Sequence, residues 1–381
     1  MICSSSRALG ACFSHANLIP KEGTMRLATF NAENLFDRPK AMNLSDRSLG
    51  DQILSDFAEL NQLIEKDPYT PRVKEKILSL FHKQSRYIKL NEDHGRLLSG
   101  DKKTVIASGR SSWIGFFELI EGSVKEPAID NTGRVVKELK GDVTCIIEVE
   151  DRAALCEFNK EVLNDRHFDH VMVVPGNDLR GINVGVLVRE PQKIIHMVSH
   201  VDDKDEVGQI FSRDCMEYTI QCGEGGPKLL VLVNHFKAKD QHPASSDEKR
   251  MRQAKRVREI YEQRKTEFDY IAIMGDLNDS PDSDPLKPLL RDGSDLVDVW
   301  GRPGFNDGGY PGTYLNCTPK EKIDYILVSP QLAKKFKTGG VERRGIWAGN
   351  DGKKFHPFMN KAIEAASDHA GLWATFDFQP A

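Results

Sequence analysis

The sequence lacks long apolar runs, and none approaches the roughly 20 residues that a membrane-spanning helix needs. We therefore expect no membrane span. It also contains neither an HExxH nor a GxSxG motif, which ranks a metalloprotease or a Ser-His-Asp hydrolase last among the candidate classes. The formal net charge is only −4, so the chain as a whole lacks the strong positive charge typical of a nucleic-acid-binding domain.

Cysteine is also scarce: the 7 cysteines are scattered without a CxxC pair. This pattern indicates neither a zinc cluster nor a disulfide framework, and it fits a reducing compartment. The serine run near the N-terminus is followed closely by Leu9-Gly10-Ala11-Cys12, without the apolar region of a signal peptide. We expect residues 1–24 to be a disordered leader and the protein to be cytoplasmic.

Short runs rich in β-branched residues recur along the chain, each bounded by turn-forming residues. Helical periodicity covers 152–164 and 246–268. Strands outnumber helices and follow one another both directly and across helices. This pattern predicts an α/β fold, a four-layer sandwich of two packed, mostly antiparallel sheets flanked by helices. The predicted strands are 26–30, 143–149, 170–174, 183–188, 193–201, 217–221, 228–233, 270–274, 322–328 and 372–378.

Residues 38 to about 140 differ from the rest of the chain. They contain helical stretches at 49–65 and 72–84 and no cluster of candidate catalytic groups. We interpret them as a helical subdomain, near the site entrance, inserted into one catalytic domain that spans 25–381. The densest basic stretch, 249–258, is more typical of a solvated helix face than of a surface that follows phosphates.

Polar residues stand at the ends of several apolar strands, where a packed scaffold presents rigid functional groups. Asn31 and Glu33 end the first strand and would share one face of it if extended. Glu148 and Glu150 end the 143–149 run, where a buried carboxylate needs a partner or a metal ion. His235 follows a third strand and, taken alone, is better explained as a core histidine.

Three further motifs complete the pattern. Asp276 and Asn278 follow a strand and precede a Ser-Pro turn, which gives one charged acceptor and one neutral amide. Asp324 lies among apolar residues and requires a partner, for which a histidine is the obvious choice. Asp368 and His369, just before the last strand, supply another carboxylate and that histidine.

In order and content, these segments resemble the endonuclease/exonuclease/phosphatase superfamily, over residues 26–378 apart from the insertion. The superfamily includes pancreatic-type deoxyribonucleases, neutral sphingomyelinases and inositol polyphosphate 5-phosphatases. This sequence departs from the usual pattern at Ile147, where relatives generally carry Gln before the metal-binding Glu. The matching segments are TFNAENLF (29–36), DVTCIIEVE (142–150), NHFKAK (234–239), GDLND (275–279), KIDYILVS (322–329) and SDHAGLW (367–373).

The resemblance implies a Mg²⁺ site, or Mn²⁺ in its place, with Glu148 as the main ligand. Asn31 would assist it, together with Glu33 or Asp368. It further implies that His369 is the general base, oriented by Asp324, although the residues themselves leave Asp276 as an alternative acceptor of the proton from water. By the same comparison, the remaining catalytic residues are Asp276, Asn278 and His235.

The implied reaction is divalent-metal-dependent phosphoester hydrolysis, with nucleic acid as the favoured substrate and no obligate protein partner. A lipid or small-molecule phosphoesterase, of sphingomyelinase or inositol-phosphatase type, is the alternative within the class. A catalytically silent binding module on the same fold is the rival outside it. Arg180, Arg189 and Arg213 are candidate phosphate contacts because guanidinium matches phosphate geometry, although surface ion pairing would also explain them.

Overall fold

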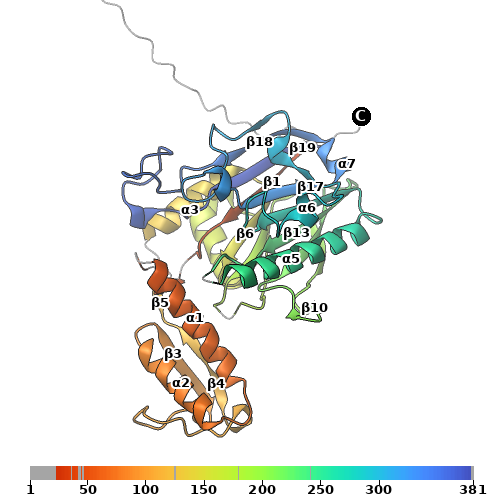
Figure 1. Cartoon of the computed structure of the whole chain (residues 1–381). Helices are drawn as coiled ribbons and strands as arrows, with labels where there is room; N and C mark the ends of the chain where they lie inside the picture. The colour runs from red at the N-terminus through yellow and green to blue at the C-terminus, as the bar shows by residue number, and fades with distance from the viewer. Residues whose placement is uncertain are drawn as a thin grey trace, which may run out of the picture.

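Two large β-sheets pack face to face, with helices on their outer faces and a separate lobe at one end (Figure 1). This computed structural model describes residues 23–35, 37–41, 44, 47–123, 126–178, 180–240 and 242–378. The predicted leader therefore lies outside the described residues, except for Gly23 and Thr24. The α/β sandwich predicted from the sequence is confirmed.

The first sheet has seven strands in the order β16-β18-β19-β1-β6-β8-β7. Most neighbours in it are antiparallel, but β1 pairs with β6, and β16 with β18, in parallel. The strands are β1 (Thr24–Asn31), β6 (Val143–Val149), β7 (His170–Val174), β8 (Asn183–Val188), β16 (Phe305–Asn306), β18 (Phe336–Glu342) and β19 (Gly371–Asp377).

The second sheet has six strands in the order β15-β17-β14-β13-β12-β9. Only the β13–β14 pair is parallel. The strands are β9 (Lys193–Val198), β12 (Cys215–Gln221), β13 (Lys228–His235), β14 (Tyr270–Asp276), β15 (Val297–Asp298) and β17 (Asp324–Val328). A small hairpin, β10 (Lys204–Asp205) with β11 (Gly208–Gln209), precedes β12.

Helices cover the outer face of each sheet. On the first sheet they are α3 (Glu126–Leu139) and α4 (Arg152–Glu157), the latter continued by the π-helix η2 (Phe158–Leu163). On the second sheet, α5 (Pro243–Arg264) and the short α6 (Lys287–Leu290) do the same. The other short helices are α7 (Pro330–Ala333), η1 (Arg110–Ser112), η3 (Asn164–Arg166), η4 (Val299–Gly301), η5 (Pro319–Glu321) and η6 (Ala362–Glu364).

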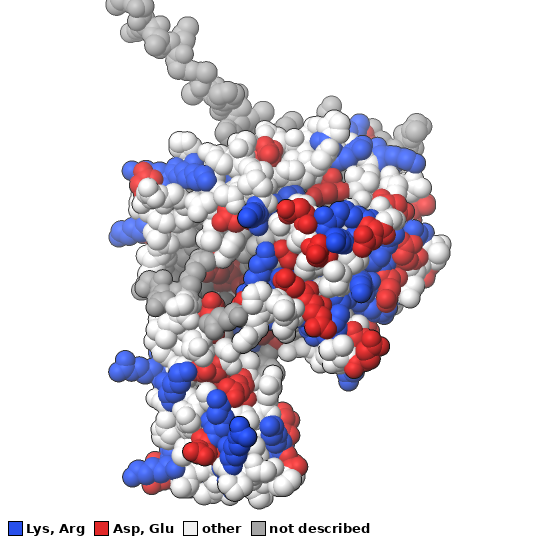
Figure 2. All heavy atoms as spheres, in the orientation of Figure 1, with Lys and Arg blue, Asp and Glu red and all other residues white. Residues whose placement is uncertain are grey.

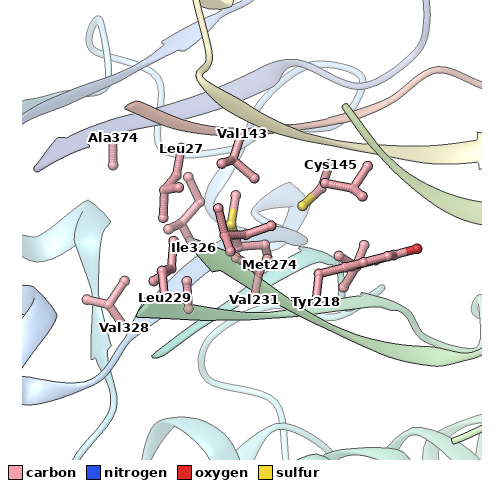
Figure 3. Close-up of a cluster of buried hydrophobic side chains, with 14 of the residues drawn as sticks. Leu27, Val143, Cys145, Tyr218, Leu229, Val231, Met274, Ile326, Val328 and Ala374 are labelled. Carbon is pink, nitrogen blue, oxygen red and sulfur yellow. The ribbon is translucent and has the colours of Figure 1, made fainter. Parts of the chain in front are cut away.

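The main core lies between the two sheets, as Figure 3 shows. Alternation along each strand builds it, because successive side chains point to opposite faces of a sheet. In β13, Leu229, Val231 and Val233 enter this core. The intervening Leu230 and Leu232 pack under α5. This two-sided burial fixes the register of the strands and therefore where their polar ends lie.

The lobe in Figure 1 is built from α1 (Arg47–Ile64), α2 (Pro71–Lys83), β3 (Ile88–His94) and β4 (Ile114–Leu119), around a core of its own. The short pair β2 (Asp37–Pro39) and β5 (Glu121–Ser123) joins the two ends of this segment. The segment is helical only in part, because β3 and β4 form an antiparallel sheet. Helix α3, within the range predicted for the insertion, packs instead on the first sheet.

None of the described helices is long and apolar enough to cross a membrane. The five cysteines in the described part of the chain are all free thiols.

Candidate active site

The predicted site residues converge because of how the strands run. The carboxyl ends of the parallel pairs β1–β6 and β13–β14 carry Asn31, Glu148, His235 and Asp276. Strand β17 runs antiparallel to β14, so its first residue, Asp324, lies opposite Asp276. Strand β19 likewise runs antiparallel to β1, and His369 stands two residues before its first residue, Gly371. Both sheets therefore contribute to one end of the sandwich.

The buried amide of Asn31 lies at the centre of this cluster. Its Nδ2 donates to Glu148 Oε1 at 3.2 Å and to Asp276 Oδ2 at 3.2 Å, and it lies 3.5 Å from His369 Nε2. Its Oδ1 accepts from the backbone N–H of Glu33 at 3.0 Å. One hydrogen bond leaves the second lone pair of this oxygen available, so the role of Asn31 as an assisting metal ligand stays a prediction, while its Nδ2 orients the carboxylates around it.

Glu148 lies at a β-bulge, where the pairing of β6 with β8 shifts between Ile147 and Val149. Its backbone is left-handed, with φ 64°. The extra residue breaks the strict alternation of the strand, so Glu148 and Glu150 no longer share a face. Glu148 lines the central pocket, whereas Glu150 is absent from the pocket lining.

His369 and Asp324 form a buried pair. Nδ1 of the imidazole lies 2.9 Å from Asp324 Oδ2, which leaves Nε2 facing the pocket, 3.8 Å from Asp276 Oδ2. The ring of Tyr314 packs against that of His369, with centroids 4.8 Å apart. Burial favours the neutral imidazole, but the charge and hydrogen bond of Asp324 outweigh it and raise the pKa of His369 well above its ordinary value.

Asp276 and Asn278 form a tight turn after β14. The backbone N–H of Asn278 donates to Asp276 Oδ1 at 2.8 Å, and its Nδ2 donates to Phe236 O at 3.1 Å. Burial raises the pKa of Asp276, with further repulsion from the nearby carboxylates of Asp324 and Glu148. Asp276, Asp324 and His369 offer ligand atoms within 4.8 Å of one another, so this group could also hold a cation.

His235 and two arginines form the opposite wall. His235 Nε2 lies 3.6 Å from Glu148 Oε1, and its buried Nδ1 has no hydrogen-bond partner in the part of the chain that the structure describes. Burial and the charges of Arg213 and Arg180 lower the pKa of His235 well below its ordinary value, so the ring is neutral. Asp178 accepts from Arg180 at 2.7 Å and pairs with Arg213 at 2.8 Å. These ion pairs hold the pKa of Asp178 far below its usual range despite burial.

A pocket of about 480 Å³ collects these groups. Glu33, Asp368, Arg180 and Arg213 line it, together with the catalytic candidates Glu148, His235, Asp276, Asn278 and His369. The prediction for Arg189 is wrong. The backbone N–H of Arg189 donates to the carbonyl oxygen of Asp142, which stands just before β6, at the opposite end of this strand from Glu148. At the usual rise per residue of a β-strand, the backbones of Asp142 and Glu148 are about 20 Å apart.

The four arginines of the basic stretch of α5 form ion pairs, so their guanidinium groups are not free to follow a chain of phosphates. Arg250 is fully buried and pairs with Asp279 at 3.0 Å, directly beneath the loop that follows Asn278. Figure 2 shows Lys and Arg interspersed with Asp and Glu over the face that carries α5. The other pairs are Arg252 with Asp205, Arg256 with Asp203 and Arg258 with Glu262.

Sequence reasoning missed several residues that shape the site. Tyr314 supports His369, Asp178 gathers the two arginines, and Lys239 reaches Asp279 Oδ1 at 2.8 Å. Lys239 could have been found, because it belongs to the NHFKAK segment. Asp178 stands two residues before Arg180, a spacing that suits an ion pair but is common in loops.

A family model described as the Endonuclease/Exonuclease/phosphatase family matches residues 124–369, more than half of the chain. No curated protein sequence matches the chain significantly. Among solved structures, an endonuclease/exonuclease/phosphatase family protein from Bacteroides thetaiotaomicron is 18% identical, with a TM-score of 0.48 over 67% of this chain and 89% of its own.

Truncated TDP2 from Caenorhabditis elegans is 17% identical, with a TM-score of 0.47 over 66% of this chain and 90% of its own. The human Nocturnin catalytic domain is 14% identical, with a TM-score of 0.44 over 65% of this chain and 86% of its own. On the strength of the family match, this chain belongs to the endonuclease/exonuclease/phosphatase family, whose members are phosphoester hydrolases that generally depend on a divalent metal.

Proposed function

We propose that the pocket hydrolyses a phosphoester by in-line attack of water, with a divalent cation held by Glu148 and the His369–Asp324 pair as general base. The convergence around Asn31 carries the proposal, because one amide nitrogen reaches both Glu148 and His369 Nε2. The two proposed centres are therefore within the span of a single phosphate group and its cation.

The donor set fits a hard cation. Glu148, Glu33 and Asp368 present carboxylates to the pocket, and buried Asp276 lies beside them with a raised pKa. Carboxylate oxygens gathered in one pocket suit Mg²⁺ or Mn²⁺, because these ions prefer oxygen ligands. We assign Glu148 as the main ligand, assisted by Asn31 together with Glu33 or Asp368. When bound, the cation supplies Lewis-acid stabilisation of a phosphoryl oxygen.

The remaining residues handle the water and the phosphate. Asp324 fixes the orientation of His369, so that Nε2 faces the pocket. Because the charge of Asp324 raises the pKa of the ring, His369 can take a proton from the attacking water only in its deprotonated form, and a cation held by Glu148 beside it would lower that pKa and favour this form. Asp276 and Asn278 position that water and a phosphoryl oxygen. Neutral His235, on the opposite side, can donate a hydrogen bond as charge develops on the phosphate. Arg180 and Arg213 add positive charge at the same wall.

Nucleic acid remains our first candidate substrate, although the ion pairs of α5 remove one argument for it. A small-molecule phosphoester is the second candidate. It is favoured by the size of the pocket, since about 480 Å³ lies within the range of small-molecule sites.

The test is hydrolysis of bis-p-nitrophenyl phosphate with Mg²⁺, with Mn²⁺ and with a chelator. We expect turnover only with a cation, and a loss of about 10²- to 10⁴-fold in His369→Gln because a general base is removed. Circular dichroism of the variant checks that it remains folded. Turnover that persists in chelator, or in His369→Gln at the wild-type rate, would refute the proposal.

A further inference from the structure

The separate lobe contributes a wall to the catalytic pocket. Ala41, Leu44 and the first turns of α1 line it beside Glu148 and Arg180. On α1 the lining residues are Gly50, Asp51 and Leu54, spaced so that they share one helix face. Figure 1 shows the N-terminal end of α1 at the sandwich and the rest of the helix running away from it.

Close packing holds this wall in place. A Cβ on Gly50 would lie 2.6 Å from the carbonyl oxygen of Ala41, so the helix can approach the chain there only without a side chain. Leu54 is half-buried and packs against the core of the lobe on its other side. Helix α1 is therefore tied both to the chain that enters the lobe and to the core of the lobe.

The chemistry of the wall is mixed. Leu54 offers an apolar surface, and Tyr314 and Ile323 line the same pocket from the catalytic domain. Asp51 adds a carboxylate to this wall. Burial lowers the pKa of Arg180, but the charge and hydrogen bond of Asp178 raise it, and Asp51 is close enough to Arg180 to add to that rise, so that the pKa lies above its ordinary value. A flat ring with polar edges fits such surroundings, because apolar side chains pack on its faces and polar groups bind its edge.

We infer that α1 makes the pocket selective for a phosphoester that carries a single nucleoside-sized group, at a strand end or in a free nucleotide. Leu54 contacts the face of that group. Asp51 disfavours a further phosphate beyond it, since specificity often comes from a repulsive element. An internal linkage of a closed strand carries phosphates on both sides and meets that repulsion. The inference rests on the proposed function and narrows its substrate.

Three substrates test it, with bis-p-nitrophenyl phosphate as the reference. They are a covalently closed single-stranded DNA circle, the same DNA linearised, and the p-nitrophenyl ester of thymidine 5′-monophosphate. We expect the rate of cleavage of the circle to be at least about tenfold lower than the rate of hydrolysis of the linear strand or of the ester. Hydrolysis of the linear DNA alone identifies strand ends as the source, and hydrolysis of the ester alone identifies free nucleotides.

Comparable cutting of the circle would overturn the inference. The inference would also be overturned if the protein hydrolysed the reference substrate but neither the linear DNA nor the ester, although the proposed function would then stand. Failure to hydrolyse the reference substrate at all would remove the proposed function and this inference with it.

A matched pair of variants tests the wall itself. Leu54→Ala should lower the ratio of kcat/KM for the nucleotide ester to that for the reference substrate about tenfold, the effect expected for lost apolar contact. Leu49→Ala, on the same helix but outside the pocket lining, should leave the ratio unchanged. Asp51→Asn, a second variant at an exposed position, should increase cutting of the circle relative to the linear strand. The role of α1 would be refuted if Leu54→Ala left the ratio of kcat/KM for the ester to that for the reference substrate unchanged and Asp51→Asn left the preference for linear over circular DNA unchanged.

Discussion

Three residues of the site adopt left-handed backbone conformations that side chains rarely take. Glu148, Asn278 and Glu33 have φ values of 64°, 55° and 50°. Such conformations cost about 1–3 kcal/mol each and persist where surrounding structure holds them. The sequence indicated these residues, but regular alternation places Glu148 and Glu150 on one face of the strand, and only the family resemblance favoured Glu148. The bulge separates the two side chains, and no residue type in 143–150 predicts it.

Gly275 adopts a backbone conformation near the end of β14 that brings Asp276 into the site, and the effect of replacing it can be predicted. Its φ is +126°, and a Cβ there would lie 2.0 Å from the carbonyl oxygen of Asn234, a backbone atom that cannot yield cheaply. We expect Gly275→Ala to lower the free energy of unfolding by about 2 kcal/mol or more in urea denaturation. Gly301→Ala is the control, since a Cβ at Gly301 meets open space. Equal stability of the two variants would contradict this account.

At the scale of elements, the long and strongly patterned segments were predicted well. The boundaries of β6, β7 and β8 agree with the sequence to the residue, because β-branched runs bounded by turns leave little choice. Strand β18 was missed, since its sequence FKTGGVE carries two glycines and little apolar character. Strands β3 and β4 were missed because neither shows a clear period of two: β3 (IKLNEDH) is polar over most of its length, and β4 (IGFFEL) carries apolar residues on both faces.

Strand β12 is joined to helix α5 by Glu217, which accepts from His200 Nε2 at 2.7 Å and Arg264 Nε at 2.8 Å. Burial opposes the charged carboxylate, but these hydrogen bonds and the Arg264 charge lower the pKa of Glu217. A carboxylate with a lower pKa in the folded state stabilises the fold above the unfolded pKa of about 4.3. That contribution is lost as the pH falls through the folded value.

We therefore expect the difference in unfolding free energy between the wild type and Glu217→Gln to shrink as the pH is lowered from about 6 to about 3. Urea denaturation at a series of pH values measures it. Glu267→Gln, which changes an exposed partner of the same arginine, is the control. A difference independent of pH would show that Glu217 acts through packing alone.

At the scale of the whole molecule, the site exists only when both sheets are assembled. Its residues span the chain from Asn31 to His369 and meet because β1–β6 and β13–β14 end at the same edge of the sandwich. The sequence could predict this convergence, since the order of the motifs resembles the family. The sequence placed the inserted segment near the site entrance, but it could not identify which of its residues line the pocket, because Gly50, Asp51 and Leu54 belong to an ordinary amphipathic helix.

The most direct test compares Glu148→Gln with Glu150→Gln in metal-dependent hydrolysis of bis-p-nitrophenyl phosphate at saturating Mg²⁺ or Mn²⁺. Both changes remove one charge from neighbouring positions of the same strand end, but only Glu148 lines the pocket. We predict a loss of at least about a hundredfold for Glu148→Gln and a rate close to the wild type for Glu150→Gln. An inactive Glu150→Gln beside an active Glu148→Gln would contradict the proposed site.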